Sequence, residues 1–371
     1  MVERSSFQLL DVRLQLEAEA SDLEPILYAY SRFLDGDGGG RVDGWLKVDA
    51  ANSRILSDRQ EWPLHTGVEL VEQLYPRFLE RFYDAAGRHA ILHAGAVAPP
   101  DGDCVLLAAP AGHGKSTLTL ELARRGWTFF SDDFAPLDLS CGEVSPFPRA
   151  VGIVPGSEAT PQPFGDQISS AQPTLFGKQL VDPGCHERVK VAQLSDRRPA
   201  AHLFILSGNE GDAPTLEIVF DRAFDVEFRR RLSALDGVRV VEESQEATLT
   251  RMTVETDPTK PTAQPLGELV THPAVLYCSK RWSQREGYAS PPSCQPLSRR
   301  HAAEAIGREL LNRRPGGALL RRFNDNPVEM LLELASTLRH TQCWSLQVGP
   351  LEATADIVEQ KTAALPRGGQ R

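Results

Sequence analysis

Hydrophobic and polar residues alternate along residues 7–17, and this two-residue period predicts a half-exposed β-strand. Residues 21–34 begin with Ser and Asp and continue with apolar residues at helical spacing, which predicts a capped α-helix. A second amphipathic helix is expected over residues 67–86, where Pro76 should kink or divide it. These elements predict an N-terminal accessory α+β region over residues 1–87.

Between residues 88 and 208 the pattern changes to short apolar runs and one helix. Residues 91–98 and 104–109 have the length and composition of buried strands. The helix expected over residues 116–125 ends at a glycine, and residues 127–131 form the next strand. Strands that alternate with a helix indicate an α/β core, for which we expect a mixed sheet.

The remaining chain divides into a weakly patterned part and a helical part. Residues 209–296 contain strand candidates at 215–220 and 238–243 among many turn residues, and this part is interpreted as an insertion or subdomain. Residues 297–371 contain two helical patterns and a strand, which are expected to complete the core.

Composition narrows the function classes. The chain has 371 residues and a formal net charge of -10, so its overall field repels nucleic acid and anionic membranes. Its six cysteines lie far apart without a C-x-x-C pair, a spacing typical of isolated reduced thiols. No export signal or bilayer-spanning apolar run is visible in the sequence, and we expect a cytoplasmic protein. Formation of a homo-oligomer stays open.

A glycine-rich motif carries the first candidate chemistry. Residues 109–116, APAGHGKS, match the phosphate-loop pattern G-x-x-x-x-G-K-[ST], with Ala109 in place of the first glycine. The glycines let consecutive backbone N–H groups point inward at a helix N-terminus, where phosphate binds. Lys115 is expected to contact the β- and γ-phosphates, and the Ser116 hydroxyl to bind Mg²⁺. An ordinary glycine-rich turn with a solvated lysine is disfavoured by the strand before the motif and the helix after it. The expected nucleotide contacts are Ala111, Gly112, His113, Gly114, Lys115, Ser116 and Thr117.

Two adjacent carboxylates follow at the end of the next strand. Asp132 and Asp133 come 17 and 18 residues after Lys115, so a helix and a strand return the chain to the loop. Because side chains alternate along a strand, the two carboxylates should point to different sides. One can hold Mg²⁺ or its waters, and the other can take the proton of an acceptor hydroxyl. A helix cap or a turn is the alternative reading of such a pair.

His93 lies in the strand that precedes the phosphate-loop strand. Its imidazole can hydrogen-bond one of the aspartates and tune the basicity of that carboxylate. A histidine in an apolar strand is also often a core residue with no chemical role.

Together, the histidine-bearing strand, the G-x-G-K-S loop and the Asp-Asp pair resemble the catalytic core of HPr kinase/phosphorylase over about residues 88–150. Residues 296–312 and 343–358 are similar to the C-terminal part of stand-alone HPr-kinase-like proteins. The resemblance implies an α/β P-loop core of the HPr kinase/phosphoenolpyruvate carboxykinase type. It also implies an ATP- and Mg²⁺-dependent kinase that acts on a serine hydroxyl of a protein or peptide, with GTP as a possible donor.

The resemblance also implies roles for individual residues. Asp132 matches the catalytic base and Asp133 its partner near Mg²⁺, with Ser116 as the other metal contact. His93 matches the histidine held by the aspartates. The arginine-bearing signature of true HPr kinases is missing after the aspartates, and Arg149 is the nearest candidate for a substrate contact. The missing signature puts HPr as the substrate, and the reverse phosphorolysis reaction, in doubt.

The loop also departs from the family at two positions, where Ala109 stands for a glycine and Thr117 for an acidic residue. Two other functions therefore remain open. Small-molecule kinases related to shikimate kinase also place aspartates after the phosphate-loop helix. A nucleotide-binding regulatory protein without phosphoryl transfer is the third possibility.

Overall fold

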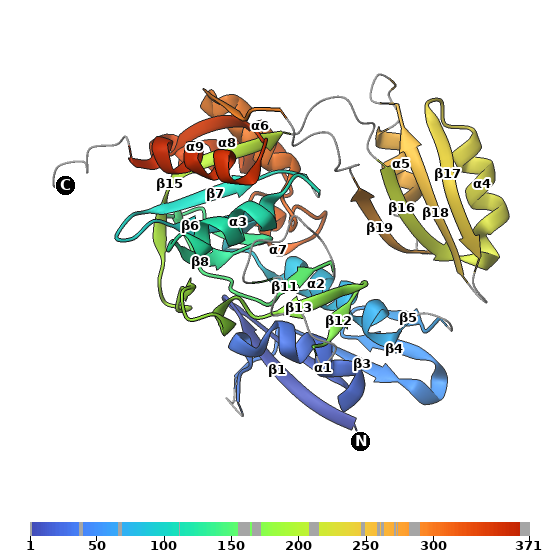
Figure 1. Ribbon diagram of the computed structural model, residues 1–371. Helices are drawn as coiled ribbons and strands as arrows, with labels where there is room; N and C mark the ends of the chain where they lie inside the picture. Colours follow the sequence, from blue (N-terminus) through green and yellow to red (C-terminus); the bar gives the residue numbers. More distant parts are fainter. Residues whose placement is uncertain are drawn as a thin grey trace.

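The chain folds into α/β structure with mixed sheets and helices (Figure 1). This computed structural model describes residues 2–36, 40–65, 69–110, 112–154, 164, 172–207, 215–245, 249–257, 260, 263–270, 272, 274–281 and 290–363. In this part of the chain no helix combines the length and the apolar character that a membrane crossing requires. All six cysteines carry free thiols.

The N-terminal layer contains a five-stranded sheet and two helices. Its strands are β1 (Val2–Leu9), β2 (Val12–Glu19), β3 (Gly44–Asp49), β4 (Arg54–Ser57) and β5 (Glu61–Pro63), in that order. The single strand expected over residues 7–17 is wrong, because Leu10 adopts a φ of 58° and turns the chain into a hairpin of β1 and β2. Alternation continues across a tight hairpin, so periodicity alone missed the turn.

The two helices of this layer are α1 (Ala20–Ala29) and α2 (Leu70–Ala85). The side-chain cap expected for α1 is wrong, since its N-cap is Glu19 without a capping hydrogen bond. Pro76 does not divide α2, which continues through it. Leu74, Phe78 and Phe82 pack α2 into the core. This packing stabilises the helix although Pro76 has no backbone N–H group to donate.

A nine-stranded mixed sheet forms the centre of the molecule. Its strands are β6 (His89–Ala98), β7 (Cys104–Ala108), β8 (Thr128–Ser131), β9 (Phe134–Asp138), β10 (Glu143–Val144), β14 (Lys190–Val191), β15 (Arg198–Ser207), β20 (Ser293–Pro296) and β21 (Gln342–Gln347). β7 and β21 run parallel to β15, whereas β6 runs antiparallel to β7, β8 and β9. The first half of β6 pairs with β9 and the second half with β8, so the bend between β8 and β9 lies beside the middle of β6.

Helices cover both faces of this sheet. Val105 and Leu107 of β7 pack in one apolar cluster with α3 (Lys115–Arg124) and α9 (Leu351–Ala363). Leu106 points the other way, into a cluster with α6 (Arg299–Arg308), α7 (Ala318–Arg321) and α8 (Pro327–Thr337). Successive side chains of β7 point to opposite faces of the sheet, and both faces are buried. The sequence of β7 is therefore a continuous apolar run.

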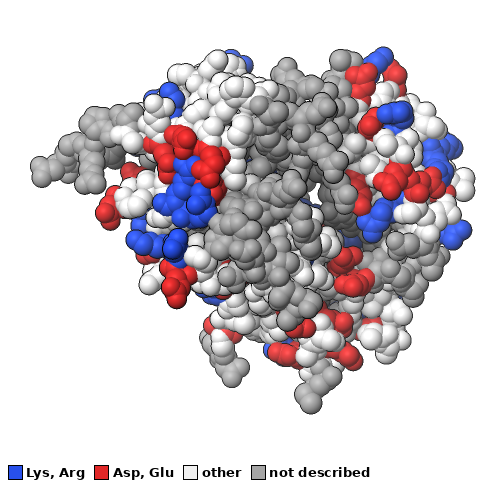
Figure 2. All heavy atoms as spheres, viewed as in Figure 1, with Lys and Arg blue, Asp and Glu red and all other residues white. Residues whose placement is uncertain are grey.

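Ion pairs join α3 to α9 across their exposed faces. Arg125 Nη1 lies 2.6 Å from Asp356 Oδ1 and 2.9 Å from Glu359 Oε2, and its Nη2 lies 2.6 Å from Glu352 Oε2. Basic and acidic side chains accordingly lie together over these helices, at the left of the face in Figure 2. Arg125 at the end of α3 therefore anchors α9.

Two smaller sheets complete the structure. β11 (Val151–Ile153), β13 (Lys178–Val181) and β12 (Thr174–Leu175) form a three-stranded sheet. β17 (Val238–Gln245), β18 (Leu249–Thr256), β16 (Thr215–Asp221) and β19 (Val275–Arg281) form a four-stranded sheet with α4 (Asp225–Ser233) and α5 (Ala263–Val270), drawn at the right of Figure 1.

Two sets of contacts cross the domain boundaries expected from the sequence. β20, which falls inside the predicted insertion 209–296, pairs with β21 in the central sheet. Phe134 and Phe147 pack in the same apolar cluster as Phe7 and Phe78 of the N-terminal layer. Such long-range packing leaves no local mark on the sequence.

Candidate active site

The glycine-rich loop connects β7 to α3. Gly112 and Gly114 adopt φ values of 83° and 77°, and Gly114 is the N-cap of α3. Left-handed backbone at these positions favours glycine, as the motif predicted. Ala109 is not one of the described residues with a positive φ, so the backbone at this position accepts a Cβ. The Ala-for-Gly departure therefore does not strain this loop.

The other expected loop contacts lie on both sides of Gly114. Lys115 is buried, and its Nζ donates hydrogen bonds to Ala109 O at 2.8 Å and Pro110 O at 3.1 Å. His113 is buried within the loop, and Thr117 is half-buried on the first turn of α3. Ala111 lies outside the described residues.

The two aspartates lie in the bend between β8 and β9. Phe134 N donates to Ser131 Oγ at 3.1 Å, which stabilises the bend. Burial raises the pKa of Asp132, and the side chain of Ser116 acts on this carboxylate in the opposite direction. The charges of Asp133 and Asp132 also act on Lys115, so the aspartates lie near the phosphate loop.

Asp133 has different partners from Asp132. His93 Nε2 lies 3.0 Å from Asp133 Oδ1, and Arg149 Nη2 donates to Asp133 Oδ2 at 3.0 Å. The same Arg149 nitrogen lies 3.8 Å from Asp132 Oδ1. The expectation that the carboxylates point to opposite sides is thus wrong, because a bend rather than a regular strand carries them to one guanidinium. His93 thus lies within ion-pair distance of one of the two aspartates, Asp133.

Arg149 is a buried part of this cluster and not a surface charge. Its guanidinium lies over the Phe134 ring, 4.7 Å from the centroid, and only 8% of the residue is exposed. Arg149 neutralises Asp133 and approaches Asp132, and its expected contact with a substrate stays a prediction.

Glu309 is a site residue that sequence reasoning missed. It caps the C-terminal end of α6, 216 residues after His93, and its Oε2 lies 2.9 Å from His93 Nδ1. The backbone also joins the two residues, since His93 N donates to Glu309 O at 2.8 Å. Nothing in the local sequence marks Glu309, because its role depends on a contact between distant segments.

Burial and charge separate the pKa values of the two aspartates. Burial raises the pKa of Asp132, and the neighbouring Asp133 charge adds to this, although Arg149 opposes it. Burial also acts to raise the pKa of Asp133, but the hydrogen bond from His93 and the charges of His93, Arg149 and Lys115 hold that pKa far below its usual range. Asp133 is therefore the permanent anion of the pair, and Asp132 is the better proton acceptor.

His93 and Lys115 have opposite shifts. Burial alone would lower the pKa of His93, but the hydrogen bonds to Asp133 and Glu309 raise it overall. Burial lowers the pKa of Lys115, against the attraction of Asp133, Glu309 and Asp132. The cluster thus pairs two cationic groups, His93 and Arg149, with carboxylates whose charge they neutralise.

Magnesium fits one edge of this cluster. The hydroxyl of Ser116, near the Asp132 carboxylate, has lone pairs for a metal, so Ser116 can serve as a hard oxygen ligand. Asp132 Oδ1 is buried without a hydrogen-bond partner in the described structure, so an oxygen at this edge can still accept a contact. Asp133 does not fit as the expected metal ligand, because its two oxygens face His93 and Arg149. The described residues contain no cluster of three or more His, Cys, Asp or Glu arranged for a metal.

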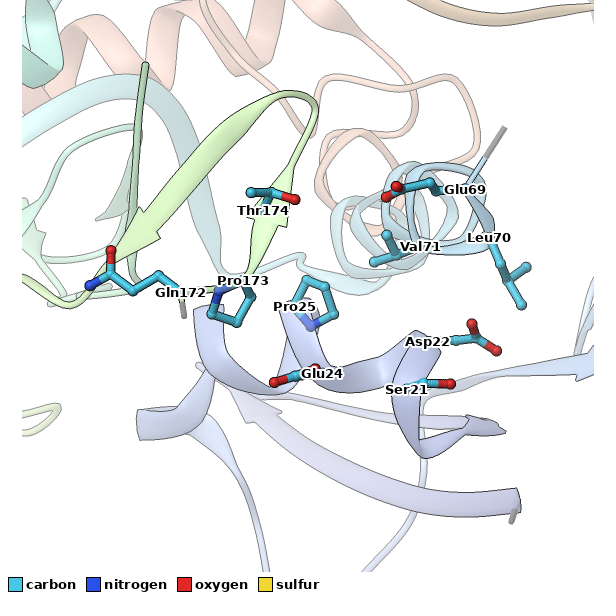
Figure 3. Close-up of a pocket in the computed structure, with 10 residues that line it drawn as sticks. All are labelled: Ser21, Asp22, Glu24, Pro25, Glu69, Leu70, Val71, Gln172, Pro173 and Thr174. Carbon is cyan, nitrogen blue, oxygen red and sulfur yellow. The ribbon is translucent and has the colours of Figure 1, made fainter. Parts of the chain in front are cut away.

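A separate cavity of about 610 Å³ lies between α1, the start of α2 and β12 (Figure 3). Asp22, Glu24 and Glu69 give it an acidic lining, and none of the residues of the Asp132 cluster contributes to it.

Comparison with known proteins adds no assignment: neither the family models nor the curated proteins that were searched give a match to this chain.

Proposed function

We propose that this protein is an ATP- and Mg²⁺-dependent phosphotransferase resembling HPr kinase, with a P-loop core of that type. Its proposed reaction transfers the γ-phosphoryl group to a serine hydroxyl of a protein or peptide. The proximity of Lys115 and Ser116 to the two aspartates carries the proposal, because it joins the glycine-rich loop to the carboxylates in one site. A shared site is what phosphoryl transfer requires of these two motifs.

The loop supplies the binding half of the mechanism. The backbone N–H groups around Gly112 and Gly114 and the N-terminus of α3 attract the phosphates. Lys115 exchanges its loop carbonyl partners for phosphate oxygens, which offer a full negative charge in place of a dipole. Mg²⁺, when bound, would neutralise charge on the triphosphate, and Ser116 is the residue that would hold the ion.

Asp132 supplies the proton-accepting half. Its raised pKa brings this carboxylate closer to a useful base, and its unpartnered Oδ1 can accept the proton of the acceptor hydroxyl. The acceptor oxygen then bonds to the γ-phosphorus while the bridging bond to the β-phosphate breaks, which releases ADP. Asp133, held by Arg149 and His93, stays ionised and fixes the charge beside the base.

A transfer assay with γ-³²P-labelled ATP tests the proposal. Wild-type protein with Mg²⁺ should label serine in a peptide library, and Lys115→Met and Asp132→Asn should each abolish labelling. Asp236→Asn is a matched control, because the Asp236 side chain is 78% exposed and pairs with Lys260 at the surface. A parallel assay with GTP tests the nucleotide preference.

Two outcomes of this assay support the alternatives. Labelling confined to small molecules in a metabolite mixture would make the protein a small-molecule kinase. Nucleotide binding by calorimetry, with equal transfer rates for wild type and Asp132→Asn, would make it a nucleotide-binding regulatory protein.

A further inference from the structure

The ring of His93 lies between two carboxylates. Its Nε2 lies 3.0 Å from Asp133 Oδ1, and its Nδ1 lies 2.9 Å from Glu309 Oε2. A neutral imidazole has only one N–H group, so it can donate to only one of these acceptors. Against two ionised carboxylates, the ring can donate at both nitrogens only when it carries two protons. The geometry is therefore that of an imidazolium between two carboxylates.

Glu309 is fixed in place by backbone contacts with β6. Leu92 and Leu310 form an isolated β-bridge, and Leu311 N donates to Ile91 O at 2.9 Å. With the bond from His93 N to Glu309 O, three successive residues of β6 hold the chain around Glu309. The same backbone register therefore sets the positions of the imidazole and of the carboxylate that orients it.

The charges around His93 come from three elements. Asp133 faces it from the bend between β8 and β9, Glu309 faces it from the end of α6, and Lys115 acts on it electrostatically from α3. Arg149 lies behind Asp133, on the opposite oxygen of that carboxylate. Two negative charges, on Asp133 and Glu309, thus act on His93 together with one positive charge, on Lys115. Removal of the Glu309 charge leaves one negative and one positive charge.

We infer that Glu309 is a positioning residue of the active site, which holds His93 doubly protonated and thereby keeps Asp133 ionised beside Asp132. Glu309 acts through His93 and does not itself contact the proposed substrates. The inference rests on the proposed phosphotransferase function for its catalytic consequence, but its structural part concerns only the state of His93.

Glu309→Gln tests the inference with little change in shape. The glutamine can still accept a hydrogen bond from Nδ1 but lacks the charge. Glu304→Gln is the matched control, because Glu304 lies on the same helix α6 and pairs with Arg300 at the surface. Histidine-ring ¹H–¹⁵N spectra, assigned with His93→Asn, report both ring nitrogens in the full-length protein without nucleotide.

Wild type and Glu304→Gln should show both ring nitrogens of His93 protonated at neutral pH, and Glu309→Gln should show one of them deprotonated. The transfer rate kcat should fall about tenfold or more in Glu309→Gln, with KM for MgATP changed less than about twofold. The double variant Glu309→Gln/His93→Asn should be no slower than His93→Asn alone, because the two substitutions remove the same interaction between these side chains.

An unchanged ring spectrum in Glu309→Gln would overturn the inference, as would fully additive losses in the double variant. A wild-type protein without transfer activity would overturn the proposed function only, since the ring spectra still decide the state of His93. If Glu309→Gln unfolds, Glu309→Asp keeps the charge but shortens the reach. A wild-type ring spectrum in that folded variant would also contradict the positioning role.

Discussion

Gly95 of β6 and Thr119 of α3 pack so closely that a Cβ on Gly95 would lie 2.1 Å from Thr119 Oγ1. Thr119 is fully buried, and its hydroxyl has no hydrogen-bond partner among the described residues. The missing side chain at Gly95 therefore sets how closely α3, which carries Lys115 and Ser116, approaches the strand that carries His93.

Gly95→Ala should destabilise the protein by about 1–3 kcal/mol, because the new methyl group overlaps Thr119 Oγ1. Urea unfolding measures this change. The double variant Gly95→Ala/Thr119→Ala should recover much of the loss, since it removes the oxygen that the methyl group meets. A double variant as unstable as Gly95→Ala would show that the overlap is not the cause.

Asp132→Asn and Asp133→Asn should change stability in opposite directions at neutral pH. The folded pKa of Asp132 is raised by burial, so its ionisation opposes folding above the unfolded value of about 4, and Asn removes this penalty. The folded pKa of Asp133 is lowered by His93 and Arg149 against burial, so its charge stabilises the fold above about pH 4 and Asn loses that contribution.

Urea unfolding from pH 4 to pH 8 measures both variants. The gain of Asp132→Asn over wild type should grow as the pH rises above about 4, while its phosphoryl transfer falls about 10²- to 10⁴-fold. The loss of Asp133→Asn should shrink toward acid pH. Two variants with the same sign at pH 7 would contradict the separated pKa values.

His93→Asn should destabilise the protein in a pH-dependent way. Burial acts against protonation, but Asp133 and Glu309 raise the folded pKa above the unfolded value of about 6.5. The stability contribution of His93 is then fully present below about pH 6.5 and is lost as the pH rises through the folded pKa.

The difference in unfolding free energy between wild type and His93→Asn should therefore be about 2 kcal/mol at pH 6 and smaller at pH 9. His340→Asn, at an exposed position, is the control and should show little difference at either pH. A His93→Asn difference that stays constant over this range would refute the imidazolium assignment.

Asn312 should be one of the most sensitive positions for stability. Its Oδ1 accepts from Ile91 N at 2.9 Å, and its Nδ2 donates to Ala86 O at 3.0 Å and His89 O at 2.8 Å. Asn312 is fully buried, so Asn312→Leu leaves buried backbone groups without partners. The expected loss is about 3 kcal/mol or more, since each unpaired buried group costs about 1–3 kcal/mol.

Asn326→Ala provides the scale for this measurement. It removes the side-chain cap of α8 and should cost only about 1 kcal/mol. Thermal and urea unfolding of both variants give the comparison. A loss for Asn312→Leu no larger than that for Asn326→Ala would show that water replaces the broken hydrogen bonds.

The sequence could predict the elements around the loop because each depends on residues close together in the chain. β6, β7, α3 and β8 lie within a residue or two of their predicted bounds. Gly112 and Gly114 have the left-handed backbone that the motif demanded. Alternation and helical period reflect local geometry, so one segment contains enough information to reveal them.

The same local information was insufficient for the N-terminal hairpin and for β20. Leu10 turns the chain without a glycine, asparagine or proline at that position to mark it. β20 is a short strand that pairs with β21, about fifty residues later in the chain. In both cases contacts with other segments, and not local preference, decide the structure.

By itself, the amino-acid sequence determined the glycine-rich loop, the paired aspartates and a histidine close enough to serve them, because a contiguous strand–helix–strand unit carries most of these residues. Only the tertiary structure decided how charge is divided among them. It placed Arg149 beside both aspartates and brought Glu309 from 216 residues away to His93. Electrostatic effects depend on distance in space and on burial, and neither quantity can be read from spacing along the chain.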